Sequence, residues 1–126
     1  MQYTVKSTIL GFEHVTSVEI NEIDEMFATL RSTDGSNVSF TLANPYILRE
    51  YSFDIPTPIS VLLDINEKSN LIVYNIVVVQ DPLDESCVNF LAPLIFNKDN
   101  GTMAQAVLDI KSHPELGVAE PIKNYR

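Results

Sequence analysis

Residues 71–79 read LIVYNIVVV, an almost unbroken apolar run in which most side chains are β-branched. β-Branched side chains favour extended backbone, and an apolar run without alternation is typical of a strand buried on both faces. The run is too short to cross a membrane as a helix, which needs about 20 residues. We therefore predict a central strand over residues 71–79, covered on both sides by the rest of the chain.

Downstream of this run, residues 87–97 (CVNFLAPLIFN) predict a second long strand, interrupted at Pro93. Proline has no N–H to donate to a strand ladder, so Pro93 marks an edge, a bulge or a bend. Asn100 and Gly101 then favour a tight turn, and residues 102–110 are expected to run back as the antiparallel partner. Together these segments predict a hairpin.

Upstream of the run, residues 38–42 alternate apolar and polar side chains, which indicates a half-buried strand. Asp34 and Gly35 precede it and favour positive φ in a hairpin turn, so residues 26–33 are expected to form the partner strand. Residues 22–31 also fit an amphipathic helix, because their apolar side chains recur at i, i+3, i+4 and i+7. We favour the strand, since the turn and its partner both require it.

One short helix is predicted over residues 58–64. Thr57 can cap it, and Pro58 suits the first helical position. Ile59, Leu62 and Leu63 then make one apolar face, with which the helix should pack against the strands.

Shorter strands are expected at Thr4, at residues 15–20 and at residues 51–53. With these, seven or eight strands follow one another at short spacing, which is the pattern of a small barrel or sandwich. The predicted fold class is all-β and mainly antiparallel. We expect a single small β-barrel-like domain over residues 1–126, with one short helix.

The chain carries 8 Lys and Arg against 17 Asp and Glu, a net charge of −9, and its pI is near 4.4. Direct nucleic-acid binding is disfavoured, because a phosphate backbone needs a basic stripe to displace its counterions. The charge either keeps the protein soluble or favours basic partners. No apolar run reaches the length of a membrane span, and the first residues lack a signal-peptide layout, so we expect a cytoplasmic protein without membrane contact.

No catalytic or metal-binding pattern stands out. His14 and His113 lie far apart, in no metal-ligand spacing. Nothing local activates the thiol of Cys87, although a pair with a histidine base stays open because such partners meet only in the fold. The acidic clusters at residues 22–25 and 81–85, the second including Asp84, lack the spacing of a calcium loop. We therefore predict no enzyme activity, no metal and no cofactor.

Three stretches give the chain a family resemblance: residues 9–13 (ILGFE), residues 40–45 (FTLANP) and residues 88–97 (VNFLAPLIFN), the last followed by residues 105–108 (QAVL). The last stretch is the most specific, because a strand broken by Ala-Pro, closed by Asn and followed by a turn is not generic β composition. Over nearly its whole length the chain resembles FliW, a family of flagellar assembly factors.

The resemblance implies a β-barrel-like fold and a non-enzymatic regulator with two protein partners. One is flagellin, bound in the cytoplasm. The other is CsrA, the RNA-binding repressor of flagellin translation, which the family antagonises through a surface other than the RNA site. Export of flagellin would free the protein to bind CsrA, so that flagellin translation follows export. A basic CsrA would be steered toward an acidic partner.

The candidate partner-binding residues are motif positions expected at a surface. They are Phe12 and Glu13 in the first loop, and Asn44, Pro45 and Tyr46 after the first hairpin. The Asn-Pro pair is also an ordinary turn signal, so a structural role stays open. The short helix is expected to flank a groove for apolar helical ends of flagellin.

The alternative function is a small-molecule-binding or catalytic β-barrel. Such a barrel needs polar or titratable residues at inward positions. The apolar side chains expected inside predict a filled interior instead: Val73, Val77, Val88, Phe90 and Leu94.

Overall fold

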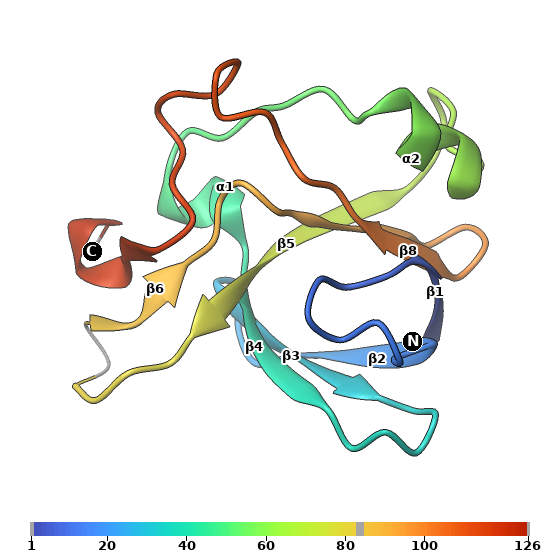
Figure 1. The fold of residues 1–126 in the computed structure, drawn as a ribbon, viewed down its shortest axis with the longest axis horizontal. Coiled ribbons are helices and arrows are strands. Elements are labelled where there is room, and N and C mark those ends of the chain that lie inside the picture. The colour runs from blue at the N-terminus through green and yellow to red at the C-terminus, as the bar shows by residue number, and fades with distance from the viewer. Residues whose placement is uncertain (1, 83–84, 126) are drawn as a thin grey trace.

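The computed structural model describes residues 2–82 and 85–125 (Figure 1). Asp84, part of one acidic cluster, lies outside the described residues. The described residues form nine strands, two short α-helices and a 3-10 helix. In chain order these are β1 (Gln2–Ser7), β2 (Ser17–Glu22), β3 (Phe27–Ser32), β4 (Ser39–Ala43), α1 (Pro45–Leu48), α2 (Thr57–Leu62), β5 (Leu71–Val78), β6 (Cys87–Val88), β7 (Leu94–Asn97), β8 (Thr102–Gln105), β9 (Glu120–Pro121) and η2 (Ile122–Tyr125).

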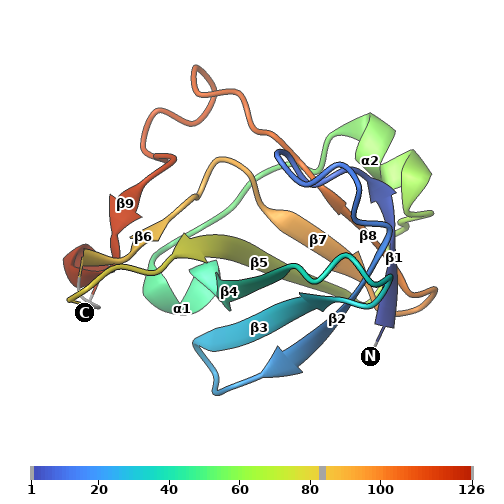
Figure 2. The same ribbon diagram turned by 60° about the horizontal axis from the view of Figure 1, so that its bottom comes forward.

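Seven of these strands close into a barrel in the order β4-β3-β2-β1-β8-β7-β5, with β5 pairing back onto β4 (Figures 1 and 2). Strands β6 and β9 extend the sheet beyond β5. The pairs in the barrel are antiparallel except for β1 with β8, which run parallel with Val5 opposite Met103. The predicted fold class, a mainly antiparallel β-barrel, is confirmed.

Apolar side chains fill the interior of the barrel. Alternate residues of each strand point inward, and on β5 these are Ile72, Tyr74 and Ile76. The rings of Tyr3 and Tyr74 pack against Phe96 at centroid distances of 5.0 and 6.2 Å. The other buried members of this core are Ile9, Val15, Val18, Ala28, Leu30, Leu42, Leu94 and Met103. A filled apolar interior does not favour a ligand-binding or catalytic barrel.

A second apolar layer lies outside the barrel, and it corrects part of the predicted interior. Val73 and Val77 alternate with Tyr74 on β5 and so face the outer side, where Val77 packs with Val88 and Phe90. Of the side chains predicted to fill the barrel, only Leu94 does so. The central strand over residues 71–79 is confirmed and covered on both sides along its middle. Its end is not covered, since Val78 and Val79 are 57% and 52% exposed.

Helix α2 covers the outer face of β7 and β8. Ile59 and Leu63, one helical turn apart, pack on Ile95 and Ala104. The predicted helix is confirmed, with two corrections. Thr57 is the first helical residue and Pro56 occupies the cap without a side-chain hydrogen bond, and Leu62 lies on the solvent side, 42% exposed.

The end of α2 is held by two asparagines of the β7–β8 hairpin. The side-chain amides of Asn97 and Asn100 donate to the carbonyl of Leu63 at 2.8 and 2.9 Å. The hairpin turn itself forms as predicted, with Gly101 at a φ of 68°. These contacts satisfy a carbonyl that a helix end would leave without a partner.

The strand predicted over residues 87–97 is two short strands, β6 and β7, both paired with β5. Val88 lies opposite Val77 and Leu94 opposite Tyr74, so residues 89–93 stand opposite only two residues of β5. The interruption predicted at Pro93 is confirmed, but it is a five-residue bulge. The bulged segment leaves the ladder and covers the outer layer.

Buried polar side chains hold this bulge in place. The amide of Asn75, fully buried, donates to the carbonyl of Asn89 at 2.7 Å. The hydroxyl of Tyr51 donates to the carbonyl of Phe90, also at 2.7 Å, and burial raises the pKa of Tyr51 to about 12. A bulge whose backbone groups are satisfied in this way keeps one shape.

The C-terminal segment covers the bulge, with Arg49 as its main anchor. The guanidinium of Arg49 lies 5.3 Å from the ring centroid of Phe90 and 5.8 Å from that of Tyr125. It also pairs with the carboxylate of Glu120 at 3.4 Å. Strand β9 and helix η2 are thereby fixed beside β6, where β9 pairs with it.

Residues 22–31 contain no helix. Strand β2 ends at Glu22, and a tight turn leads into β3 at Phe27. In this turn one carboxylate oxygen of Asp24 accepts the N–H groups of Met26 and Phe27, both at 2.8 Å. The strand prediction is confirmed and the helical alternative is wrong, because pairing with β2 and β4 overrides the local helical pattern.

Strands β3 and β4 form the predicted hairpin, with Asp34 and Gly35 in the loop between them. This loop spans residues 33–38, with Gly35 at a φ of 88° and Asn37 at 60°. The carboxylate of Asp34 accepts the N–H of Ser36 at 2.9 Å and that of Thr16 at 2.6 Å. Hydrogen bonds from Ser36 and Thr16 hold the pKa of Asp34 well below its usual range.

Three further local predictions are wrong. Residues 51–53 form no strand, because Tyr51 serves as a cover over the outer layer. The strand predicted over residues 102–110 is shorter, because β8 ends at Gln105. The residues after it run beside the bulge, where the N–H of Leu108 donates to the carbonyl of Leu91 at 2.7 Å. Helix α1 is a second short helix where the sequence predicts only a turn.

Candidate functional site

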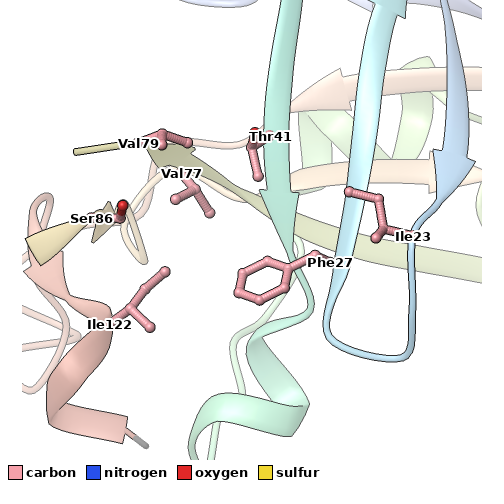
Figure 3. Close-up of a pocket in the computed structure, with 7 residues that line it drawn as sticks. All are labelled: Ile23, Phe27, Thr41, Val77, Val79, Ser86 and Ile122. Carbon is pink, nitrogen blue, oxygen red and sulfur yellow. The ribbon is translucent and has the colours of Figure 1, made fainter. Parts of the chain in front are cut away.

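An apolar groove lies on the outer wall of the barrel, between β3–β4 on one side and the β5–β6 extension on the other (Figure 3). Its volume is about 320 Å³. The lining side chains come from the β2–β3 turn, β3, β4, the end of β5 and the residue after it, the residue before β6, and η2. They are Ile23, Phe27, Thr41, Val77, Val79, Ser86 and Ile122.

Strand alternation explains why these side chains meet. Phe27, Thr41 and Val77 alternate with Ala28, Leu42 and Ile76, which belong to the interior core, so the first set must face outward. Register brings them together, because Thr41 pairs with Val77 across β4 and β5. Beyond this pair the β4–β5 ladder ends, while β5 continues one residue further.

The floor and walls of the groove differ in exposure. Val77, Ser86 and Ile122 are buried, whereas Ile23 and Val79 stand at the two walls with 61% and 52% of their surface exposed. The hydroxyl of Ser86 accepts the N–H of Gln80 at 2.9 Å and so is occupied within the protein. The groove therefore offers mainly apolar contact.

Carboxylates adjoin the groove residues along the chain on both walls. Asp24 and Glu25 directly follow Ile23. Asp81 comes two residues after Val79, and Glu85 directly precedes Ser86. All four carboxylates are exposed. The amino group of Lys123 is 2.6 Å from Glu85. The surroundings of the groove thus carry net negative charge.

The first two predicted site residues lie in the loop between β1 and β2. Phe12 is half-buried and packs edge-on against Phe40 at 4.7 Å. Glu13 is exposed, and its carboxylate accepts the N–H of Gly11 at 3.2 Å. Phe12 therefore has a packing role, and Glu13 is the side chain open to a partner.

The other three predicted residues form the start of α1. The side chain of Asn44 accepts the N–H of Tyr46 at 3.0 Å and caps the helix, and Pro45 is buried. Tyr46 is 51% exposed and packs edge-on against Tyr51 at 5.7 Å. Asn44 and Pro45 thus build the helix, while Tyr46 and its neighbour Ile47 present apolar surface.

The structure does not bring the two predicted sets together. Phe12 packs on Phe40 near the start of β4, whereas Asn44 follows the end of that strand. None of the five predicted residues lines the groove. Nor does α2 flank it, because that helix covers β7 and β8 instead.

Sequence reasoning missed the groove, although two signals pointed toward it. The run at residues 71–79 remains apolar at its end, beyond the length that the fold covers. Ile23 is an isolated apolar residue among Glu22, Asp24 and Glu25. A single exposed apolar side chain is ordinary, and Ile23 gains meaning only because the fold places it beside Phe27 and Val79 in one apolar groove.

The described residues contain no group of three or more His, Cys, Asp or Glu side chains placed to hold a metal ion. His14 is exposed, and the ring of His113 lies 3.9 Å from the carboxylate of Glu115. The thiol of Cys87 contacts the carbonyl of Glu85 at 3.4 Å. Within residues 2–82 and 85–125, no helix has the length and apolar character needed to span a bilayer.

Comparison with known proteins gives one consistent result. The model of the family described as FliW protein matches residues 1–122. A flagellar assembly factor FliW 1 of Wolinella succinogenes is 55% identical over 125 residues, covering 99% of this chain and 98% of the relative. The flagellar assembly factor FliW of Sulfurimonas denitrificans is 45% identical over 125 residues, with coverage of 99% and 98%. The fold is similar to a crystal structure of the flagellar assembly factor FliW, with a TM-score of 0.84 at 20% identity over 96% of this chain and 84% of that one.

Proposed function

Because the chain belongs to the FliW family of flagellar assembly factors, we propose that it binds flagellin in the cytoplasm and, when free of flagellin, binds and antagonises the repressor CsrA. Export of flagellin then releases the protein, CsrA is removed from the flagellin message, and translation resumes. The protein acts by binding and catalyses no reaction.

The observation that carries this proposal is the open apolar groove on the outer wall. Ile23 and Val79 leave large apolar surface exposed on either side of it, with 61% and 52% of their surface open to solvent. Apolar surface that gathers around a groove is a common feature of protein-binding sites. A surface of this kind supports a role in binding other proteins.

The charge of the chain supports a basic partner. Its net charge is −9, and carboxylates adjoin the groove on both walls. Complementary charge speeds association and makes it sensitive to salt, while affinity comes from the buried apolar contacts. An RNA-binding repressor carries the basic side chains that RNA phosphates require, so CsrA suits this surface.

The test is a calorimetric titration with CsrA and flagellin from the same organism. The protein is titrated with CsrA at about 50 mM and about 300 mM salt, which changes the screening length by a factor of about two to three. We expect saturable binding that weakens at the higher salt. Flagellin is added in a second titration and should displace CsrA.

Absence of CsrA binding at both salt concentrations contradicts the antagonist role. If flagellin then binds, the protein acts on flagellin alone. Binding of neither partner contradicts the whole proposal.

A further inference from the structure

We propose that the open end of the barrel binds a small zwitterion of the amino-acid class, a molecule that carries an ammonium and a carboxylate group on an apolar body. The site is a recess of about 250 Å³, here called the mouth recess, which is lined by Tyr3, Ile20, Glu22, Ile72, Tyr74 and Lys98. It shares no lining residue with the outer groove, and the inference does not rest on the proposed function.

The two ends of the barrel are closed differently. The loop between β1 and β2 lies across one end (Figure 1), where Ile9 and Val15 are buried in the interior core. Strand pairing places the start of β1, the end of β2, the start of β5 and the end of β7 together at the other end. At this second end Ile20 and Ile72 remain half-buried, and the mouth recess lies over them.

Charged side chains occupy inward positions at this open end. The inward-facing set of β2 that contains Ile20 ends at Glu22, and the inward-facing set of β7 that contains Phe96 continues to Lys98. Both Glu22 and Lys98 are exposed. Titratable groups at inward positions are what a ligand site in a barrel mouth requires, whereas the filled interior beneath them serves as an apolar floor.

The two charges that line the mouth recess are not used within the protein. In residues 2–82 and 85–125, neither Glu22 nor Lys98 forms an ion pair. Asp99 follows Lys98, but its two carboxylate oxygens accept from the side-chain amide and the N–H of Asn70 at 2.9 and 3.0 Å. An unpaired carboxylate and an unpaired ammonium attract ligand groups of the opposite sign, and together they favour a zwitterion over a simple ion.

Two tyrosine hydroxyls add polar contacts to the mouth recess. Tyr3 and Tyr74 are only 3% and 6% exposed, and both rings pack on Phe96. A tyrosine hydroxyl in such a buried residue normally has a hydrogen-bond partner, yet neither has one in the described part of the chain. Burial raises the pKa of both tyrosines, so both hydroxyls remain available as donors at neutral pH.

These groups define how the ligand lies. Its carboxylate meets the ammonium of Lys98 and the tyrosine hydroxyls, its ammonium meets Glu22, and its apolar body covers Ile20 and Ile72. The recess is smaller than the roughly 300–1,000 Å³ of sites for drug-sized molecules, so the ligand is small. For so few ligand atoms we expect a Kd of about 1 mM.

An NMR titration of the full, isotope-labelled chain tests the site. The zwitterionic probes are leucine and ε-aminocaproate, which differ in the spacing of their charges. Isoamylamine and isocaproate are the matched controls, because they are leucine without its carboxylate and without its amino group. We expect at least one zwitterion to shift the backbone amide signals of the lining residues saturably, and to bind at least about threefold more tightly than either control.

Substitutions identify the groups that recognise the ligand. Glu22→Gln, Lys98→Gln and Tyr74→Phe each remove one polar contact at nearly constant shape, and each should weaken binding of the zwitterion by about threefold to tenfold. Glu115→Gln and Lys111→Gln are the matched controls, because both residues are exposed between β8 and β9 and do not line the recess. Circular dichroism and thermal melting verify that each variant folds.

Several outcomes overturn the proposal. If neither zwitterion shifts the signals of the lining residues, the mouth recess is not a ligand site. If isoamylamine or isocaproate binds as tightly as the zwitterions, the ligand is a simple cation or anion. If the shifts are confined to the outer groove, or if the recess variants bind as tightly as wild type, the site lies elsewhere. None of these outcomes affects the proposed function, which the titrations with CsrA and flagellin test separately.

Discussion

The outer face of β7 and β8 resembles the outer face of β3, β4 and β5 in its side chains, but only the first is covered by a helix. Both place small or apolar side chains outward, yet α2 covers the first, while the second forms an open groove. The difference lies in which segment packs on each face. Residues 57–63 place Ile59 and Leu63 on the face of β7 and β8, whereas no described segment places an apolar pair of this kind over the groove. An outward apolar face becomes core when the chain returns over it and becomes a candidate interface when it does not.

The largest loss of stability is expected from a substitution beneath the covered face. Leu63→Ala removes a fully buried side chain beneath α2 and should lower the free energy of unfolding by about 2–5 kcal/mol. Urea denaturation measures the change. Leu62→Ala, one residue earlier and 42% exposed, is the control and should change it by less than about 0.5 kcal/mol. Equal effects would mean that α2 does not cover the barrel as described.

The hydrogen bonds that hold α2 should give the next largest effect. Asn97→Ala removes a buried amide that donates to the carbonyl of Leu63 and accepts from the N–H of Asp99 at 3.0 Å. The expected loss in free energy of unfolding is about 1–3 kcal/mol. Asn100→Ala should cost less, because Asn100 is more exposed and Asn97 remains on the same carbonyl.

The two asparagines should also act together. In the Asn97→Ala, Asn100→Ala double variant both donors to the Leu63 carbonyl are gone, so the loss should exceed the sum of the single losses. Strict additivity would show that the shared carbonyl does not matter for the cover.

In the β3–β4 loop, away from both of these faces, the free energy of unfolding should depend on pH through Asp34. Its pKa is lowered in the fold by hydrogen bonds from Ser36 and Thr16, so the carboxylate contributes stability above its unfolded pKa of about 3.9. That contribution is lost as pH falls through the folded pKa. Asp34→Asn should therefore be less stable than wild type at about pH 7, and the gap should narrow by about pH 3. Urea unfolding at both values checks this, and a gap that is independent of pH contradicts it.

The smallest effect on stability is expected in the groove. Ile23→Ser changes a side chain that is already 61% exposed, so the free energy of unfolding should move by less than about 0.5 kcal/mol. Thermal melting of Ile23→Ser and wild type gives the measurement. A large loss would show that Ile23 serves the fold, and the contrast between covered and open faces would fail.

Much of the fold could be predicted from local patterns. The run at residues 71–79, the alternation at residues 38–42 and the turn at Gly101 each indicate their structure within a few residues of chain. The interruption at Pro93 was also readable, because proline cannot donate to a ladder. In each of these segments, the local backbone preference of the residues agrees with the strand pairing or turn that the fold adopts.

The errors arise where distant parts of the chain decide. Tyr51 sits in a β-like stretch, but its hydroxyl donates to the carbonyl of Phe90, far along the chain, so the segment is a cover and not a strand. The sides of Val73 and Val77 could not be assigned, since a strand apolar on both faces gives no hint of which face is inside. The groove was missed for the same reason, because it depends on which outer face remains uncovered.

The parallel pairing of β1 with β8 also affects the order in which the protein folds during synthesis. Strand β1 is synthesised before β8, so the pairing of Val5 with Met103 forms only after nearly the whole barrel has been synthesised. Contacts so distant in sequence form slowly, because a long loop must close before they stabilise anything. Until residues 102–105 leave the ribosome, one edge of β1 stays open to pairing with other chains. The barrel therefore closes as a late step, and a nascent chain that stops before β8 presents β1 as an open sheet edge, paired on the β2 side alone.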